Sequence, residues 1–198
     1  NTENGYYYLN LSTGKMTVGW EKINNKWYYF QGNGVMATGW VKDNGKYYYM
    51  LTDGTMHTGW VSIDGVYYYL GDSGAMATGW VNMDNGWYYF DPNDGKCTVN
   101  SAREIKDSWY MFGSDGKMVT GWQQVDGGYY YFHTDGRMLT GWLSDGTNSY
   151  YMDPANGRMS TGWKQIENSY YYFNNSGHKL PGWVQIDGTY YYLNPSDK

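Results

Sequence analysis

Short runs in which apolar and polar residues alternate recur along the chain, and turn residues separate each run from the next. In the unit at residues 19–36, a first run ends at Ile23, Asn24-Asn25 follows, a second run ends at Phe30, and a Gln-Gly-Asn-Gly turn comes next. Aromatic and β-branched residues on both sides of Asn24-Asn25 predict a β-hairpin, because asparagine tolerates the positive φ angles of a tight turn. Later copies place Asn-Gly or Asp-Gly at this turn, at 44–45, 64–65, 126–127 and 187–188.

This turn fixes which residues of the two strands face each other. It places Trp20 opposite Tyr29, and directly opposed residues share a face of the ribbon. One face carries Tyr28 and Phe30 with the apolar positions of the first strand, and we expect it to form the shared core. The other face carries Trp20, Trp27 and Tyr29, and its copies are aromatic almost without exception.

A Gly-Trp pair recurs eight times at the start of the unit, and the step between these copies is 20 residues except for one step of 21 and one of 42. An isolated two-stranded hairpin is marginally stable, so a fixed period of this size predicts that copies of one hairpin unit stack on each other. The expected fold class is all-β, with about ten repeats of about 20 residues that form one repeat domain over residues 1–198. The eight tryptophans are Trp20, Trp40, Trp60, Trp80, Trp122, Trp142, Trp163 and Trp183.

Three places depart from the repeat. The 42-residue step contains a degenerate repeat at about 97–116, where Asn100-Ser101 stands at the expected Gly-Trp position, and the missing rings should leave a gap in the series. After Trp142, Ser149 replaces the first aromatic residue of the second strand, so that groove loses a wall. Lys179 stands where most copies have methionine, and it disfavours a cation groove before Trp183 because an ammonium repels a positive ligand.

Composition narrows the function classes. The chain has 25 Tyr and 11 Trp, only 17% charged residues and a net charge of −5, so aromatic side chains must provide most of the packing. No basic cluster is present, and electrostatic binding of nucleic acid is not expected. Neither a metal nor another cofactor is expected, because no His or Cys cluster has the spacing of metal ligands. The carboxylates are scattered, and no pair recurs on one face, so we expect no catalytic residues and no enzyme activity.

The remaining reactive residues fit structural roles. Cys97 occupies a methionine position and is interpreted as a small apolar filler. His57, His133 and His178 lie in or beside connectors that differ between repeats, and we expect solvated turn residues there. The chain has no apolar run long enough for a transmembrane segment, and its first residues do not resemble a signal peptide, so an exported form would have lost its signal.

The aromatic face has two interpretations. Aromatic stripes in repeat proteins commonly serve packing, but a packing stripe would also tolerate Leu, Ile or Phe, and the residue after the repeated glycine is always Trp. Electron-rich rings with polar edges favour the recognition of a cation or of sugar faces. The sequence therefore points to ligand grooves between neighbouring hairpins.

The unit Thr-Gly-Trp-Val, followed by three aromatic residues and then by Gly-x-Met-x-Thr-Gly-Trp, resembles the choline-binding repeat of Gram-positive surface proteins, autolysins and phage lysins. Clear copies run from Thr38 through Met56 and from Thr78 through Tyr89, and the resemblance extends from Tyr6 to Leu193. It implies a left-handed β-solenoid of stacked β-hairpins, in which aromatic cages between consecutive hairpins bind choline.

The resemblance implies a noncatalytic role in which the cages bind choline or phosphocholine of teichoic or lipoteichoic acid and attach a secreted protein to the cell wall. We expect Trp80 with Trp87 to be the weakest candidate pair, because the degenerate repeat follows it. The expected choline-binding residues are Trp20, Trp27, Trp40, Tyr47, Trp60, Tyr67, Trp80, Trp87, Trp122, Tyr129, Trp142, Trp163 and Tyr170, with Met36, Met56, Met76 and Met138 closing the cages.

Two further expectations stay open at this point. Similar aromatic repeats occur in glucan-binding domains, so binding of glucan or another carbohydrate is the alternative function. The ends of a hairpin stack expose edges, near Tyr6 and Tyr190 here, and these could support a homodimer through a terminal hairpin.

Overall fold

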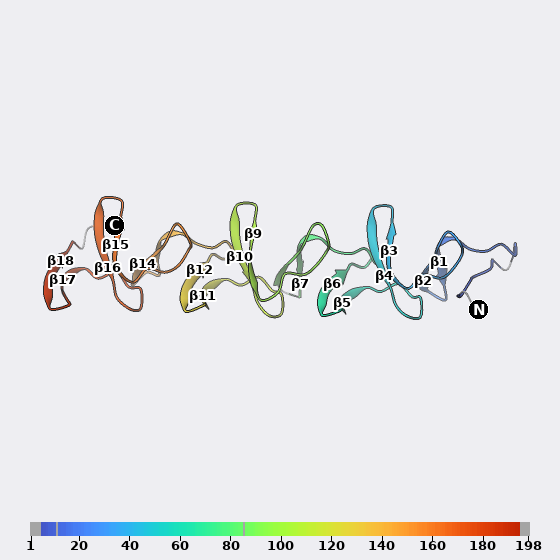
Figure 1. The fold of residues 1–198 in the computed structure, drawn as a ribbon, viewed down its shortest axis with the longest axis horizontal. Helices are drawn as coiled ribbons and strands as arrows, with labels where there is room; N and C mark the ends of the chain where they lie inside the picture. Colours follow the sequence, from blue (N-terminus) through green and yellow to red (C-terminus); the bar gives the residue numbers. More distant parts are fainter. Residues whose placement is uncertain (1–4, 11, 85, 195–198) are drawn as a thin grey trace. The chain divides into compact units, whose positions relative to one another are not determined.

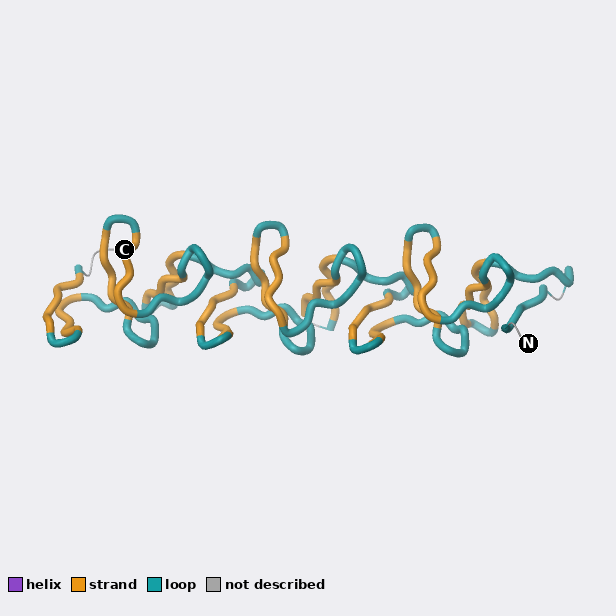
Figure 2. Tube along the Cα trace, in the orientation of Figure 1, coloured by secondary structure: helices purple, strands orange, loops and turns teal. Residues whose placement is uncertain are grey.

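The structure is a computed structural model that describes residues 5–10, 12–84 and 86–194, and this part of the chain is all-β, without a helix. In these described residues, nine two-stranded antiparallel hairpins follow one another, with loops between them (Figure 2). The strands are β1 (Gly19–Ile23), β2 (Lys26–Phe30), β3 (Gly39–Asp43), β4 (Lys46–Met50), β5 (Gly59–Ile63), β6 (Val66–Leu70), β7 (Gly79–Met83), β8 (Gly86–Phe90), β9 (Ser101–Ile105), β10 (Ser108–Phe112), β11 (Gly121–Val125), β12 (Gly128–Phe132), β13 (Gly141–Ser144), β14 (Ser149–Met152), β15 (Gly162–Ile166), β16 (Ser169–Phe173), β17 (Gly182–Ile186) and β18 (Thr189–Leu193).

The predicted register and turn are confirmed. In the first hairpin Trp20 pairs with Tyr29, and φ is 49° at Asn24 and 64° at Asn25. Both turn residues therefore have the left-handed conformation of a tight hairpin turn, which matches the twist of the strands. The degenerate repeat also forms a regular hairpin, β9–β10, in which Ala102 occupies the tryptophan position opposite Met111.

Backbone hydrogen bonds join most connectors to two hairpins. The amide of Met56, in the connector after β4, donates to the carbonyl of Trp27 in the preceding hairpin at 2.8 Å. The next amide, that of His57, donates to the carbonyl of Tyr49 in its own hairpin at 2.8 Å. Because buried amides need partners, this pattern fixes the spacing between neighbouring hairpins.

Most connectors also pack a methionine against a glycine of the next connector. Gly54 has a φ of +81°, and a Cβ built on it would overlap the thioether of Met36. The same contact joins Met56 to Gly74 and, in the second half of the chain, Met138 to Gly157. Glycine is needed here twice, for the positive φ and for the close approach of sulfur.

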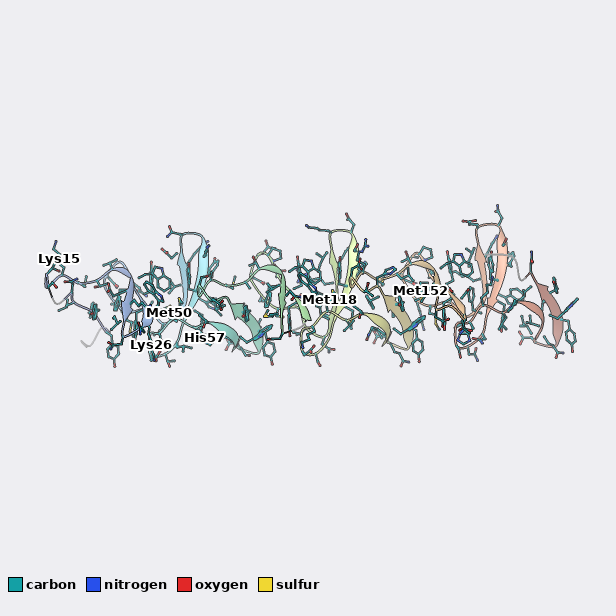
Figure 3. The ribbon with its side chains drawn as sticks, turned by 180° about the vertical axis from the view of Figure 1, so that it is seen from behind. Lys15, Lys26, Met50, His57, Met118 and Met152 are labelled. Atoms are coloured by element: carbon teal, nitrogen blue, oxygen red, sulfur yellow. The ribbon has the colours of Figure 1, made fainter. Side chains whose placement is uncertain are left out.

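The core lies in a row along the hairpins, at the last residue of each second strand. Phe30 is 2% exposed, Leu70 and Phe90 are fully buried, and Met50 and Met152 are 1% and 0% exposed. Met50 and Met152 are labelled in Figure 3. This confirms the expectation that the face with Phe30 forms the shared core.

The chain divides into two compact units, residues 1–98 and 99–198. The first contains β1 to β8, and the second contains β9 to β18. Within the second unit, the hairpins β9–β10 and β15–β16 project to the same side, with two differently oriented hairpins between them (Figure 1). Successive hairpins are thus rotated, and this rotation brings rings of one hairpin against rings of the next.

Candidate aromatic ring clusters

Three rings from two hairpins meet in the first unit, and we call Trp20, Trp27 and Tyr48 the first ring cluster. The rings of Trp20 and Trp27 are perpendicular, at 88°, with their centroids 6.4 Å apart. Tyr48, from β4, meets Trp20 edge-on at 4.7 Å and 68°. Trp27 is 42% exposed. The rings are therefore not stacked face to face, and one wall of the cluster is open to solvent.

The same arrangement recurs in both units. The tryptophan after the repeated glycine contacts a tyrosine of the following hairpin, with centroids 4.9 to 5.1 Å apart, in five further clusters. These pairs are Trp40 with Tyr68, Trp60 with Tyr88, Trp122 with Tyr150, Trp142 with Tyr171 and Trp163 with Tyr191. The position of Trp27 is taken by the exposed tyrosines Tyr47, Tyr67, Tyr129 and Tyr170.

Sequence reasoning missed the third ring. It anticipated that a ring of the next hairpin would complete each cluster, but it assigned the position of Tyr28 to the core and did not name its copies. In the structure Tyr48 belongs to that set, and it packs against the core cluster of Ala37, Val41 and Met50 together with Trp20. One tyrosine therefore joins the core to the ring cluster. The regular recurrence of this tyrosine was the signal that could have identified it.

The four predicted methionines lie in connectors and are half-buried. Met56 packs on the same core cluster as Trp20 and Tyr48, which places it beside the first ring cluster. Met76 holds the corresponding position in the next repeat, since its amide bonds to the carbonyl of Tyr47. The amide of Met36 bonds to Tyr6, and that of Met138 to Trp109, in repeats that lack the Gly-linked tryptophan. The amides of Met56 and Met76 thus bond to a hairpin that has the Gly-linked tryptophan, whereas those of Met36 and Met138 do not.

Trp80 and Trp87 repeat the geometry of the first two rings, with centroids 6.3 Å apart and planes at 84°. The hairpin that follows them belongs to the second unit. At the other irregular cluster, Trp142 and Tyr171 meet at 5.1 Å, and Ser149 stands at the position of the outer ring. The loss of a wall at this place, which the sequence predicted, is confirmed.

Charged groups lie next to several rings. The indole nitrogen of Trp20 donates to a carboxylate oxygen of Asp43 in the next hairpin at 3.2 Å. The ammonium groups of Lys22 and Lys42 lie 5.9 Å and 5.0 Å from the ring centroids of Trp27 and Tyr47, their cross-strand partners. A carboxylate favours a cation nearby, whereas each of these two lysines covers a single outer ring.

The third ring of another cluster is held by a carboxylate. The hydroxyl of Tyr150 donates to Asp145 at 2.9 Å. The backbone amides of Asn148 and Thr147 also donate to Asp145, and these bonds, together with the one from Tyr150, lower the pKa of the Asp145 carboxyl below its usual value. Burial, and then the bond to Asp145, raises the pKa of Tyr150. The carboxylate therefore remains charged and orients the ring beside Trp122.

The degenerate repeat leaves an open groove in the second unit. Ala102, Trp109 and Tyr130 line it with residues of two further connectors, and its volume is about 1290 Å³. Trp109 is 43% exposed there. The gap predicted from the missing rings is present.

The three histidines and the cysteine lie in connectors between hairpins. His57 is half-buried, and its Nε2 lies 2.9 Å from the carbonyl of Trp60, so it is not the solvated turn residue that we expected. His178 is also half-buried and meets Tyr150 edge-on at 5.3 Å, whereas His133 is exposed. Cys97 is 8% exposed, and burial raises the pKa of its thiol to about 11. Among the described residues, no group of His, Cys, Asp and Glu could hold a metal ion.

The repeats of this chain match known families of sequence repeats. Residues 17–58, 57–101, 119–162 and 160–197 match the family described as choline-binding repeat, and residues 103–118 match one described as cell wall binding repeat. The chain belongs to the choline-binding repeat family. A comparison with curated proteins finds no match.

Solved structures of Streptococcus pneumoniae proteins share these choline-binding repeats. CbpJ is 31% identical with a TM-score of 0.75, over 98% of this chain and 84% of CbpJ. The choline-binding domain of CbpL is 29% identical with a TM-score of 0.69, over 90% and 94%. Choline binding protein F is 28% identical with a TM-score of 0.63, over 99% and 90%. Proteins with these repeats are associated with the cell wall or surface. In the described chain, no helix is long and apolar enough to span a bilayer.

Proposed function

We propose that the choline-binding repeats of this protein are a noncatalytic module that binds choline or phosphocholine of cell-wall teichoic acids through aromatic cages and so holds the protein at the cell surface. The ring clusters carry the proposal. In each, two hairpins present rings at steep angles to one another, and an outer ring such as Trp27 remains 42% exposed. A compact cation can approach several ring faces at such a corner.

The chemistry of choline suits these clusters. A quaternary ammonium has no N–H to donate, so it is recognised by the faces of aromatic rings, at about 0.5 to 2 kcal/mol for each contact. Three rings provide about 4 kcal/mol, which corresponds to a dissociation constant on the order of 1 mM. Net charge also favours a cation, because the chain carries a formal charge of −5.

Weak individual sites become useful through repetition. A teichoic acid that displays many cholines meets several clusters at once, and each later contact then forms at a high effective concentration. Three complete clusters lie in the first unit, those of Trp20, Trp40 and Trp60, and two in the second, those of Trp122 and Trp163. Anchoring therefore needs no single strong pocket.

The connectors complete the proposed cages. Met56 and Met76 lie beside clusters that contain a Gly-linked tryptophan, and we assign them the role of closing these cages. We infer that the hairpins of each unit stack as a left-handed solenoid, and the rotation between successive hairpins and the bonds between connectors and hairpins support the stacking. In such a stack every cage has the same two neighbours, which explains why the ring geometry repeats.

The function is tested by elution. The protein is bound to choline-bearing cell walls, and to walls grown with ethanolamine in place of choline, and it is then washed with choline or with dextran. We expect retention only on the choline-bearing walls and release by millimolar choline. Retention on both walls that choline does not reverse would refute the proposal, and release by dextran would favour the alternative of carbohydrate binding.

A homodimer is the second part of the proposal. In β17–β18 the rings of Trp183, Tyr190 and Tyr192 are 72%, 68% and 59% exposed. A second copy of the same hairpin could cover this aromatic surface by a symmetric contact. Light scattering should then give the mass of a dimer, and Trp183→Ser should shift it toward a monomer. A monomer at high concentration, with and without choline, would exclude this arrangement.

A further inference from the structure

We propose that Lys179 occupies the ring cluster of Trp142 and Tyr171 as an internal cation, so that this cluster does not take choline. This inference rests on the proposed function for its meaning, but the placement of the ammonium is independent of it. The Nζ atom of Lys179 lies 5.7 Å from the ring centroid of Trp142 and 5.6 Å from that of Tyr171. Both distances are within the range of a cation–π contact.

The two rings are the ones that form a cage elsewhere. Trp142 and Tyr171 meet at 5.1 Å and 75°, as Trp163 and Tyr191 do at 5.0 Å and 71°. They come from different hairpins, β13–β14 and β15–β16. The ammonium of Lys179 therefore touches the same two walls that a choline would touch in a complete cluster.

The backbone places Lys179 there for the same reason that it places Met56 beside the first ring cluster. The amide of Lys179 donates to the carbonyl of Ser149 at 2.8 Å, as the amide of Met56 donates to that of Trp27. Lys179 is thus the closing residue of this cluster, with a charged end in place of a thioether. The serine at 149 removes the outer ring and leaves room for the longer side chain.

Other lysines near rings do not have this relationship. Lys22 and Lys42 each contact one ring of their own hairpin. They do not bridge two hairpins, and their contacts leave the tryptophan and the third ring of the cluster uncovered. The sequence assigned the effect of Lys179 to the connector before Trp183, and the ammonium of this connector residue lies at the ring pair of Trp142 and Tyr171.

The experiment follows individual indole N–H resonances by NMR during a choline titration of the full chain. Each resonance is assigned by its disappearance in the corresponding Trp→Phe variant. We expect the signals of Trp122 and Trp163 to shift with millimolar choline and the signal of Trp142 to remain unchanged. A shift of Trp142 comparable with that of Trp122 would overturn the inference.

A pair of variants separates the blocking lysine from the missing ring. Ser149→Tyr restores the outer ring and keeps Lys179, and we expect the indole N–H signal of Trp142 to remain unchanged when choline is added. In Ser149→Tyr with Lys179→Met, the signal of Trp142 should titrate with a midpoint within about three-fold of that of Trp122. The same response in both variants, whether present or absent, contradicts the proposal. Lys15→Met is the control for charge, since Lys15 is exposed and lies at the end of the first unit (Figure 3).

A measurement without choline tests the placement itself. The Hε protons of Lys179, assigned through Lys179→Met, should lie upfield of those of Lys15 because they are held over two rings. An unshifted position would overturn the inference. If Trp122 and Trp163 ignore choline while the lysine protons are shifted upfield, the proposed function fails and the internal cation remains.

Discussion

Replacing Gly54 by alanine tests whether the thioether of Met36 is a packing element between connectors. A Cβ on Gly54 would overlap Sδ and Cε of Met36, and even Cγ would lie 2.8 Å from it, whereas nonbonded carbon atoms prefer about 3.5 to 4.0 Å. The variant also places a side chain at a φ of +81°. Two separate costs therefore apply, one of backbone conformation and one of overlap.

Gly45→Ala isolates the first cost. Gly45 lies in the turn of the hairpin that precedes Gly54, has a φ of +79° and has no atom within 4 Å of its Cβ position. We expect it to lower the free energy of unfolding by about 1 kcal/mol, the cost of a left-handed conformation. Gly54→Ala should lower it by about 2 to 4 kcal/mol, because overpacking adds about 1 to 3 kcal/mol.

The assay is urea unfolding followed by tryptophan fluorescence, and a third variant completes the cycle. Met36→Ala is destabilising by itself, but it removes the overlapping sulfur. The double variant Met36→Ala with Gly54→Ala should therefore be more stable than the sum of the single effects predicts, by about 1 to 3 kcal/mol. Equal losses in Gly54→Ala and Gly45→Ala, or simple additivity in the cycle, would refute the reasoning.

Three further predictions concern the rings and the titrating groups. Trp40→Ala should abolish one choline site and lower the free energy of unfolding by about 2 kcal/mol while the chain stays folded, since Trp40 is 38% exposed and makes two edge-on ring contacts. Unfolding of the whole unit, seen by circular dichroism, would indicate a packing role instead. The lowered pKa of Asp145 means that its contribution to stability is present above about pH 4, its unfolded pKa, and is lost as the pH falls toward the folded pKa, so Asp145→Asn should flatten the acid side of the stability profile. The pKa of Cys97, raised by burial to about 11 from 9.0, should make its thiol about 100-fold less reactive toward a disulfide reagent at pH 8 than in the unfolded chain, and equal rates in the two states would contradict this.

The sequence predicted the hairpins well because two local signals agreed. The alternation of residues fixed which faces of the strands are apolar, and Asn24-Asn25 fixed the register, so the opposition of Trp20 and Tyr29 followed. These features depend only on neighbours within one repeat. In the degenerate repeat the sequence placed the first strand one residue too early, because Ser101 and Ala102, and not Asn100 and Ser101, occupy the positions of the Gly-Trp pair in β9–β10.

Relations between repeats were harder to predict. Which ring of the next hairpin meets Trp20 depends on the rotation between hairpins, and a pattern of alternation does not contain that angle. The position that Tyr28 and Tyr48 share was therefore assigned to the core, although Tyr48 also forms a wall of the first ring cluster. The packing of Met36 on Gly54 was not predicted either, because this contact joins two different connectors.

The connector position of Met56 can determine whether a ring cluster is available to a ligand. The backbone amides of Met56, Cys97 and Lys179 all donate to the carbonyl at the outer-ring position of the preceding hairpin, which is held by Trp27, Tyr67 and Ser149 respectively. The backbone thus brings a thioether, a thiol or an ammonium to equivalent places beside a ring pair, and an antiparallel hairpin forms in each case. Because the side chain at this position does not build the hairpin, it can change without loss of the fold. If the clusters bind choline as proposed, substitutions here set how many sites the array offers, and avidity for a polymer depends steeply on that number.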